Sequence, residues 1–140
     1  MADVSTVLSA TRGSITAPAG CGKTHLLVQA VAAHDDQLPV LILTHTNAGV
    51  AALRSRFAKL GVHPSKFRLS TLDGWGLRML HAFPARSEME PKHLLLNTPK
   101  DDYPAIRDGV LNILRGRHLN DLLGANYSRL IVDEYQDCSP

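Results

Sequence analysis

Apolar residues in this chain form two kinds of pattern, short unbroken runs and stripes at helical spacing. The run Val40–Leu43 contains no polar residue, which is typical of a strand that is covered on both faces. The stripes on either side of this run predict two helices. They are Leu27, Ala30, Val31 and His34 in a helix that begins at Lys23, and Val50, Leu53, Phe57 and Leu60 in a helix that Thr46 or Asn47 caps and Gly61 closes.

Two further strands are predicted on either side of a helical region. Lys66–Thr71 alternates between polar and apolar residues, as a strand with one buried face does. Leu130–Val132 is apolar and runs directly into two acidic residues. Between these strands, Asp73 is expected to cap a helix that ends just before Pro84.

The remaining segments carry weaker patterns. Gly13–Ala17 is short and partly apolar, and it predicts a first strand that leads into a turn rich in proline and glycine. Residues 84–102 contain several prolines and show no clean period, so they are predicted to form a loop. Pro104 is expected to open another helix. Its inward residues would be Ile106, Val110, Ile113 and Leu114.

Strand and helix alternate along the chain, and this order predicts an α/β fold. We expect a parallel sheet with helices on both faces, joined by right-handed crossovers. The length of 140 residues and the hydrophobic share of 44% suit a globular chain with one core. We therefore expect residues 1–140 to form a single domain, with residues 84–128 as an irregular or helical insertion.

Charge and cysteine content say more about the cellular compartment of the protein than about its function. A formal net charge of +2 permits a nucleic-acid partner but does not argue for one. The chain has no run of about eighteen apolar residues, so no membrane partner is expected. Its two cysteines do not make a disulfide framework, which predicts a reducing, cytoplasmic setting.

A glycine-rich turn between the first predicted strand and the helix at Lys23 resembles a phosphate-binding loop. Gly20 and Gly22 let backbone N–H groups face a phosphate, and the helix adds its positive end. Lys23 can reach the β- and γ-phosphates, and the Thr24 hydroxyl can ligate Mg²⁺. Ala17 stands where the general pattern has its first glycine, so a plain helix-capping turn is the alternative. The predicted nucleotide-binding residues are Ala17, Pro18, Ala19, Gly20, Cys21, Gly22, Lys23 and Thr24.

The acidic end of the last strand predicts the other half of a nucleotide site. A parallel strand delivers Asp133 to the carboxyl edge of the sheet, where ligands bind in open α/β sheets. Asp133 is suited to serve Mg²⁺, and Glu134 is suited to deprotonate the attacking water. The alternative is an exposed acidic turn after a buried strand. The phosphate loop upstream favours the functional interpretation.

Four segments, in order along the chain, together resemble the motifs of superfamily 1 UvrD/Rep-type DNA helicases. They are APAGCGKT, LTHTNAGVAALRSRF, STLDGW and LIVDEYQD. The resemblance implies a RecA-like P-loop NTPase fold, with ATP and Mg²⁺ as cofactors and single-stranded DNA or a tailed duplex as partner. It also implies that Lys23, Glu134 and Gln136 are catalytic, with Gln136 sensing the γ-phosphate. The residues implied to contact DNA are Thr44, Thr46, Asn47, Ser70 and Thr71.

The resemblance also shows what this chain lacks. Residues 1–16 contain no glutamine, whereas family members usually carry one there that reads adenine. The later helicase motifs, the arginine finger and the second RecA-like domain are absent, so we expect a fold that is incomplete at its C-terminus. The remainder of the helicase would be required for activity, and the chain alone is expected to be a poor ATPase. The alternatives are the motor part of a helicase-nuclease subunit and a nucleotide- or DNA-binding module without turnover.

Two other features have a structural and a functional interpretation. Trp75, the only tryptophan, suits base stacking, but a core role is favoured because it lies one turn into a helix. Arg54, Arg56 and Lys59 form a basic run that would either flank DNA or face solvent.

Overall fold

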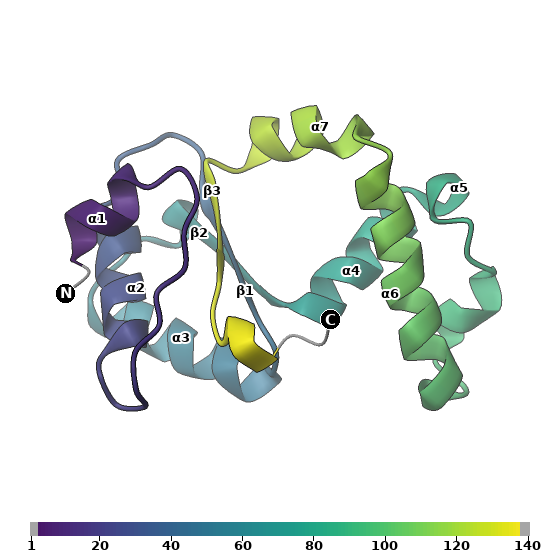
Figure 1. The fold of residues 1–140 in the computed structure, drawn as a ribbon, viewed down its shortest axis with the longest axis horizontal. Coiled ribbons are helices and arrows are strands. Elements are labelled where there is room, and N and C mark those ends of the chain that lie inside the picture. Colours follow the sequence, from purple (N-terminus) through teal and green to yellow (C-terminus); the bar gives the residue numbers. More distant parts are fainter. Residues whose placement is uncertain (1–2, 138–140) are drawn as a thin grey trace. The chain divides into compact units, whose positions relative to one another are not determined.

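The computed structural model describes residues 3–137, and it contains a three-stranded parallel sheet (Figure 1). The strands are β1 (Val40–Thr44), β2 (Phe67–Thr71) and β3 (Arg129–Val132), in the order β2-β1-β3. Val40 of β1 pairs with Arg129 of β3, and Leu43 pairs with Val132. The N–H of Asp133 donates to the carbonyl of Leu43 at 2.9 Å, so the pairing continues up to the acidic residues.

Helices make up most of the rest of the chain. The α-helices are α1 (Val4–Ser9), α2 (Lys23–Ala33), α3 (Asn47–Lys59), α4 (Leu72–Ala82), α5 (Pro84–Ser87), α6 (Pro99–Arg115) and α7 (His118–Asn126). Short 3₁₀ helices are η1 (Pro64–Lys66), η2 (Pro91–Leu95) and η3 (Tyr135–Asp137). None of the helices in residues 3–137 has the length and apolar character that a membrane span requires.

The described chain divides into two compact units. The sheet unit comprises residues 3–69 and 127–137, and the helical unit comprises residues 70–126. The core of the sheet unit is formed by α2, β1 and α3, through Leu27, Val28, Val31, Val40, Ile42, Leu53 and Phe57. Phe57 also stacks on Phe67 with a centroid distance of 4.2 Å. Burial of this apolar face is what holds α2 and α3 beside the sheet.

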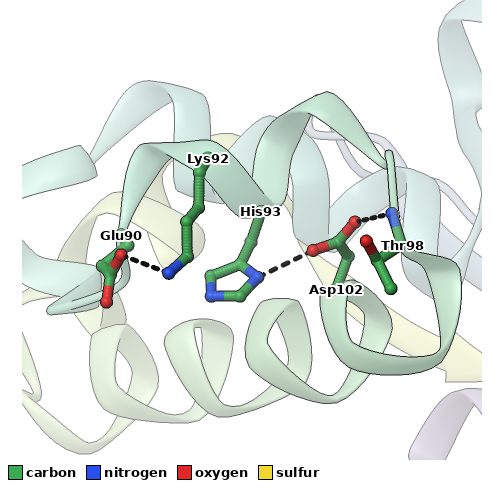
Figure 2. Close-up of polar contacts among 5 residues, drawn as sticks. All are labelled: Glu90, Lys92, His93, Thr98 and Asp102. Carbon is green, nitrogen blue, oxygen red and sulfur yellow. Dashed lines mark hydrogen bonds and ion pairs between the residues drawn. The ribbon is translucent and has the colours of Figure 1, made fainter.

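The helical unit has its own core and a buried polar cluster. Leu80, Ile106, Ile113 and Leu119 form the core. Beside it, Asp102 is only 5% exposed, and Figure 2 shows its carboxylate between His93 and Thr98. The carboxylate lies 2.7 Å from His93 Nδ1 and accepts the Thr98 N–H at 2.7 Å. This carboxylate therefore ties η2 to the first turn of α6.

Most of the predicted elements are confirmed. The strands at 40–43, 66–71 and 130–132 are present within one residue of the predicted bounds. The helices begin at Lys23 and at Asn47 as expected, and Thr46 caps the second of them by accepting the Gly49 N–H. The α/β fold class is confirmed by the alternating elements and the parallel sheet.

Other predictions are wrong. Gly13–Ala17 is not a strand and lies largely exposed, because no described strand pairs with it. Thr71 caps α4, and Asp73 lies in its first turn, since the threonine hydroxyl accepts the Gly74 N–H at 3.0 Å. Residues 84–102 hold α5 and η2 as well as loop.

The last long helix also differs from its prediction. It begins at Pro99, so that Pro104 lies inside it, because Asp102 accepts the Thr98 N–H and starts the helix a turn early. Leu114 on this helix is exposed, as is Leu60 after α3, although the apolar spacing predicts that both face inward.

Candidate functional site

The loop from Ala17 to Thr24 has the backbone that a phosphate cradle needs. Gly20 and Gly22 have φ angles of +80° and +81°, a region that residues with a side chain rarely adopt. Apart from the adjoining residues of the chain, no atom lies within 4 Å of the position where a Cβ would stand at either glycine, so the space beside them is open. Gly22 is the N-cap of α2, which places the positive end of an 11-residue helix at the loop.

Lys23 bridges the two halves of this loop. Its Nζ donates to the carbonyl of Ala17 at 2.7 Å and to that of Pro18 at 3.2 Å. The ammonium group of Lys23 thereby joins the C-terminal end of the loop to its N-terminal end. Cys21, at the tip, is exposed and forms no disulfide among the described residues.

The acidic end of β3 has an unusual backbone. Glu134 has a φ of +57°, and it lies just past the end of a strand. The other described non-glycine residues with positive φ (Glu88, Leu96 and Arg117) adjoin the end of a helix, where this conformation is common. The Glu134 carboxylate accepts a hydrogen bond from the Gln136 amide, and its carbonyl accepts the Asp137 N–H at 3.0 Å. The strand therefore ends in a defined turn that displays two carboxylates.

One cleft brings the start of α2 and the end of β3 together. It has a volume of about 210 Å³, and its lining includes Thr24, Thr44, Gly49, Arg56, Asp133 and Glu134. All of these belong to the sheet unit. The Thr24 hydroxyl and the Asp133 carboxylate are thus arranged around the same space, at the carboxyl edge of the sheet.

The charges in this cleft oppose one another. Burial raises the pKa of the Asp133 carboxyl, and the neighbouring charge of Glu134 raises that pKa further. The Glu134 N–H and the positive charges of Lys23 and Arg56 act in the opposite direction. A cation placed between the carboxylates of Asp133 and Glu134 would relieve the repulsion between them.

Sequence reasoning assigned no role in the cleft to Arg56, Gly49 or Asp137, yet all three line it. For the first two a signal was present in the sequence. Gly49, Ala52 and Arg56 succeed each other at intervals of three and four residues, so they share one face of α3. Asp137 carried no comparable signal beyond its place in the acidic motif.

The residues predicted to contact DNA have different surroundings. Thr46 and Asn47 are exposed at the start of α3, and the Thr46 hydroxyl still has a proton to donate after accepting the Gly49 N–H. Thr44 is 2% exposed and lines the cleft. Ser70 is buried and Thr71 half-buried before α4, in the helical unit.

Trp75 and the basic run also have defined places. Trp75 is 7% exposed, and its indole N–H has no hydrogen-bond partner among the described residues. A buried ring cannot stack on a base without moving, so this structure favours the core role. Arg54, Arg56 and Lys59 are exposed, and only Arg56 belongs to the cleft of Thr24 and Asp133.

The parallel sheet, the glycine loop at the start of a helix and the acidic strand end define a RecA-like α/β protein. The family described as UvrD/REP helicase N-terminal domain matches residues 4–114. The chain belongs to this helicase family. No curated protein and no solved structure matches the chain.

Proposed function

We propose that this chain is the ATP-binding N-terminal segment of an ATP-dependent DNA helicase or translocase. In the complete protein, ATP hydrolysis would be coupled to movement along single-stranded DNA. The observation that carries the proposal is the cleft in which Thr24 faces Asp133 and Glu134 at the carboxyl edge of the sheet. Membership of the helicase family supports the same conclusion. We also propose that residues 1–140 belong to one RecA-like domain, into which residues 84–128 are inserted.

The loop fits a nucleotide phosphate. The open space beside Gly20 and Gly22 leaves room for phosphate oxygens against the backbone. The positive end of α2 and the Lys23 ammonium supply the charge that a polyphosphate requires. The nucleotide-binding residues proposed are those from Ala17 through Thr24.

The same cleft suits Mg²⁺, whose preferred ligands are oxygen atoms. Thr24 and Asp133 offer a hydroxyl and a carboxylate. The described residues contain no group of three His, Cys, Asp or Glu side chains that would hold a metal alone, so phosphate or water oxygens would complete the ligand set. When bound, Mg²⁺ would neutralise the charge that develops on the phosphates.

Glu134 and Gln136 are proposed to act on the attacking water and on the γ-phosphate. Glu134 is exposed beside the cleft, and its left-handed backbone is of a kind that costs about 1–3 kcal/mol and that clusters at functional sites. The hydrogen bond from the Gln136 amide orients the Glu134 carboxylate. Glu134 would take the proton of the water, and Gln136 would report the state of the phosphate through this bond.

DNA is proposed to contact the starts of α3 and α4. Thr46 and Asn47 present a hydroxyl and an amide at the N-terminus of α3, which suits a backbone phosphate. Ser70 and Thr71 are the corresponding groups before α4. Thr44 is buried in the cleft, so we propose that it links the nucleotide to the start of α3.

Nucleotide binding by the intact chain tests the proposal. Isothermal titration of MgATP into the wild-type chain should show binding, and Lys23→Ala should weaken it about tenfold or more, which corresponds to about 1.4 kcal/mol. Such a loss is expected because charge-assisted hydrogen bonds contribute about 1.5–3 kcal/mol each. Arg54→Ala is the matched control, because Arg54 is an exposed cation on α3 that does not line the cleft.

Turnover separates a motor from a binding module. In the complete protein, a several-fold increase of ATP hydrolysis by single-stranded DNA is expected. Binding without DNA-stimulated hydrolysis would favour a nucleotide-binding module instead. Wild-type and Lys23→Ala chains with equal affinity for MgATP would refute the proposed site.

A further inference from the structure

Arg129, the first residue of β3, holds the N-terminal helix α1. Its Nη1 donates to the carbonyl of Ala10 at 2.6 Å and to that of Val7 at 3.3 Å. Its Nη2 donates to the carbonyl of Leu8 at 2.7 Å. The guanidinium is half-buried, and its Nε atom is buried with no partner among the described residues. The side chain is therefore committed to the end of α1.

The helix depends on this contact. The last carbonyls of a helix have no partner within it, and a cation placed there is favourable. At the other end, the Asp3 carboxylate accepts the Thr6 N–H at 2.8 Å. A helix of six residues is too short to persist alone in water, so its two ends and its packing on α2 must hold it.

The position of α1 matters for the nucleotide site because the chain runs from this helix into the phosphate loop. Residues 11–16 are exposed and have no regular secondary structure, and they connect the two directly. The first part of that loop is attached at one side by Lys23, through the carbonyls of Ala17 and Pro18. On its N-terminal side, the loop follows residues 11–16, and the nearest ordered element before them is α1, which Arg129 binds.

The two ends of β3 therefore lie next to different parts of the site. Arg129 at its start binds the end of α1, from which the chain runs to the phosphate loop, and Val132 at its end leads into Asp133. The strand itself is anchored in the sheet by its register with β1, from Val40 to Leu43. The chain that leads to the phosphate loop and the acidic pair are thus both connected to β3.

We propose that Arg129 is a positioning residue for nucleotide binding: by clamping α1 to β3 it fixes the segment that enters the phosphate loop relative to Asp133. This inference rests on the proposed function of the cleft. A free N-terminal segment would have to be ordered each time a nucleotide binds, and the cost would appear as lower affinity.

Hydrogen exchange of the intact chain tests the clamp without a nucleotide. The amides of Val7 and Ala10, which donate within α1, should exchange about tenfold faster in Arg129→Gln than in wild type, while the amides of α3 stay unchanged. Arg129→Lys retains the charge but not the fork of donors, so its exchange should lie between the two. Arg115→Gln, at an exposed arginine in the helical unit, is the control.

Titration of MgATP tests the consequence for binding. At a temperature where every variant is folded, Arg129→Gln should bind about fivefold more weakly than wild type, with partial recovery in Arg129→Lys. A merely structural residue would lower the melting temperature without changing this affinity.

The outcomes are distinguishable. Unchanged exchange in α1 would overturn the clamp, and faster exchange with unchanged affinity would overturn its role in positioning. A wild-type chain that binds no MgATP would refute the proposed function. The exchange comparison would then still decide whether Arg129 fixes the N-terminal segment.

Discussion

Gly49, in the first turn of α3, provides a test of how tightly the cleft is packed. A Cβ at this position would stand 2.8 Å from Thr44 Oγ1, and 3.3 Å from both Thr44 Cγ2 and Thr46 Oγ1. Thr44 is buried and branched at Cβ, so its side chain has few alternative rotamers. Gly49→Ala must therefore displace Thr44 or the start of the helix.

Two opposing effects set the magnitude. Alanine in a helix is more stable than glycine by about 0.5–1 kcal/mol, mainly for entropic reasons. Overpacking a tight site typically costs about 1–3 kcal/mol. The overpacking cost is the larger, so Gly49→Ala should lower the free energy of unfolding by about 1 kcal/mol and the melting temperature by about 2–5 °C.

Urea unfolding of a double-mutant cycle isolates the contact. In a Thr44→Ala background the two contacts with Thr44 are gone and only Thr46 Oγ1 at 3.3 Å remains, so Gly49→Ala should become neutral or stabilising. Gly124→Ala is the matched control, because Gly124 lies in α7 with no atom within 4 Å of its Cβ position. It should raise the stability by about 0.5–1 kcal/mol. If Gly49→Ala stabilises wild type as much as Gly124→Ala does, the packing argument is wrong.

Two carboxyl groups predict opposite dependences on pH. The pKa of Asp133 is raised by burial and by Glu134, so wild type loses stability as the pH rises from about 4 through this raised pKa. Asp133→Asn should therefore be more stable than wild type at pH 7, an advantage that disappears near pH 3 in urea melts. The pKa of Asp102 is lowered by the hydrogen bond from His93 and by the Thr98 N–H, so its stabilisation is present above pH 4 or so and is lost as the pH falls through the lowered pKa. Asp102→Asn should lower the free energy of unfolding at pH 7 and should make that free energy depend less on pH in the acid range. The same dependence in the acid range as in wild type would contradict the role of the buried carboxylate.

The strongest elements of the fold could be predicted because their causes are local. The unbroken run Val40–Leu43 and the apolar face of Leu53 and Phe57 require burial wherever they occur, and both are in the core. The motif order along the chain likewise predicted the helicase family, which the match over residues 4–114 confirms.

The predictions that failed depended on partners far away in the sequence. The helix α1 has no apolar stripe long enough to predict it, and its end is held by Arg129, which is 119 residues from Ala10. Gly13–Ala17 has the composition of a strand, but a strand requires a neighbour with which to pair. The spacing of Arg56 to Gly49 and Ala52 places it on one face of α3, but the sequence did not say that this face would meet Asp133, which lies far away along the chain.

The bond between Lys23 and the carbonyls of Ala17 and Pro18 changes how this lysine contributes to affinity. Its ammonium already has partners before any ligand arrives, so capture of a polyphosphate is an exchange and yields only the difference between two sets of contacts. Removing the ammonium would also loosen the turn, and part of any loss in affinity would come from a less ordered loop. Comparing Lys23→Ala with Lys23→Arg would separate the loss of order in the loop from the other losses, since arginine retains a cation that can still bind the carbonyls of the turn.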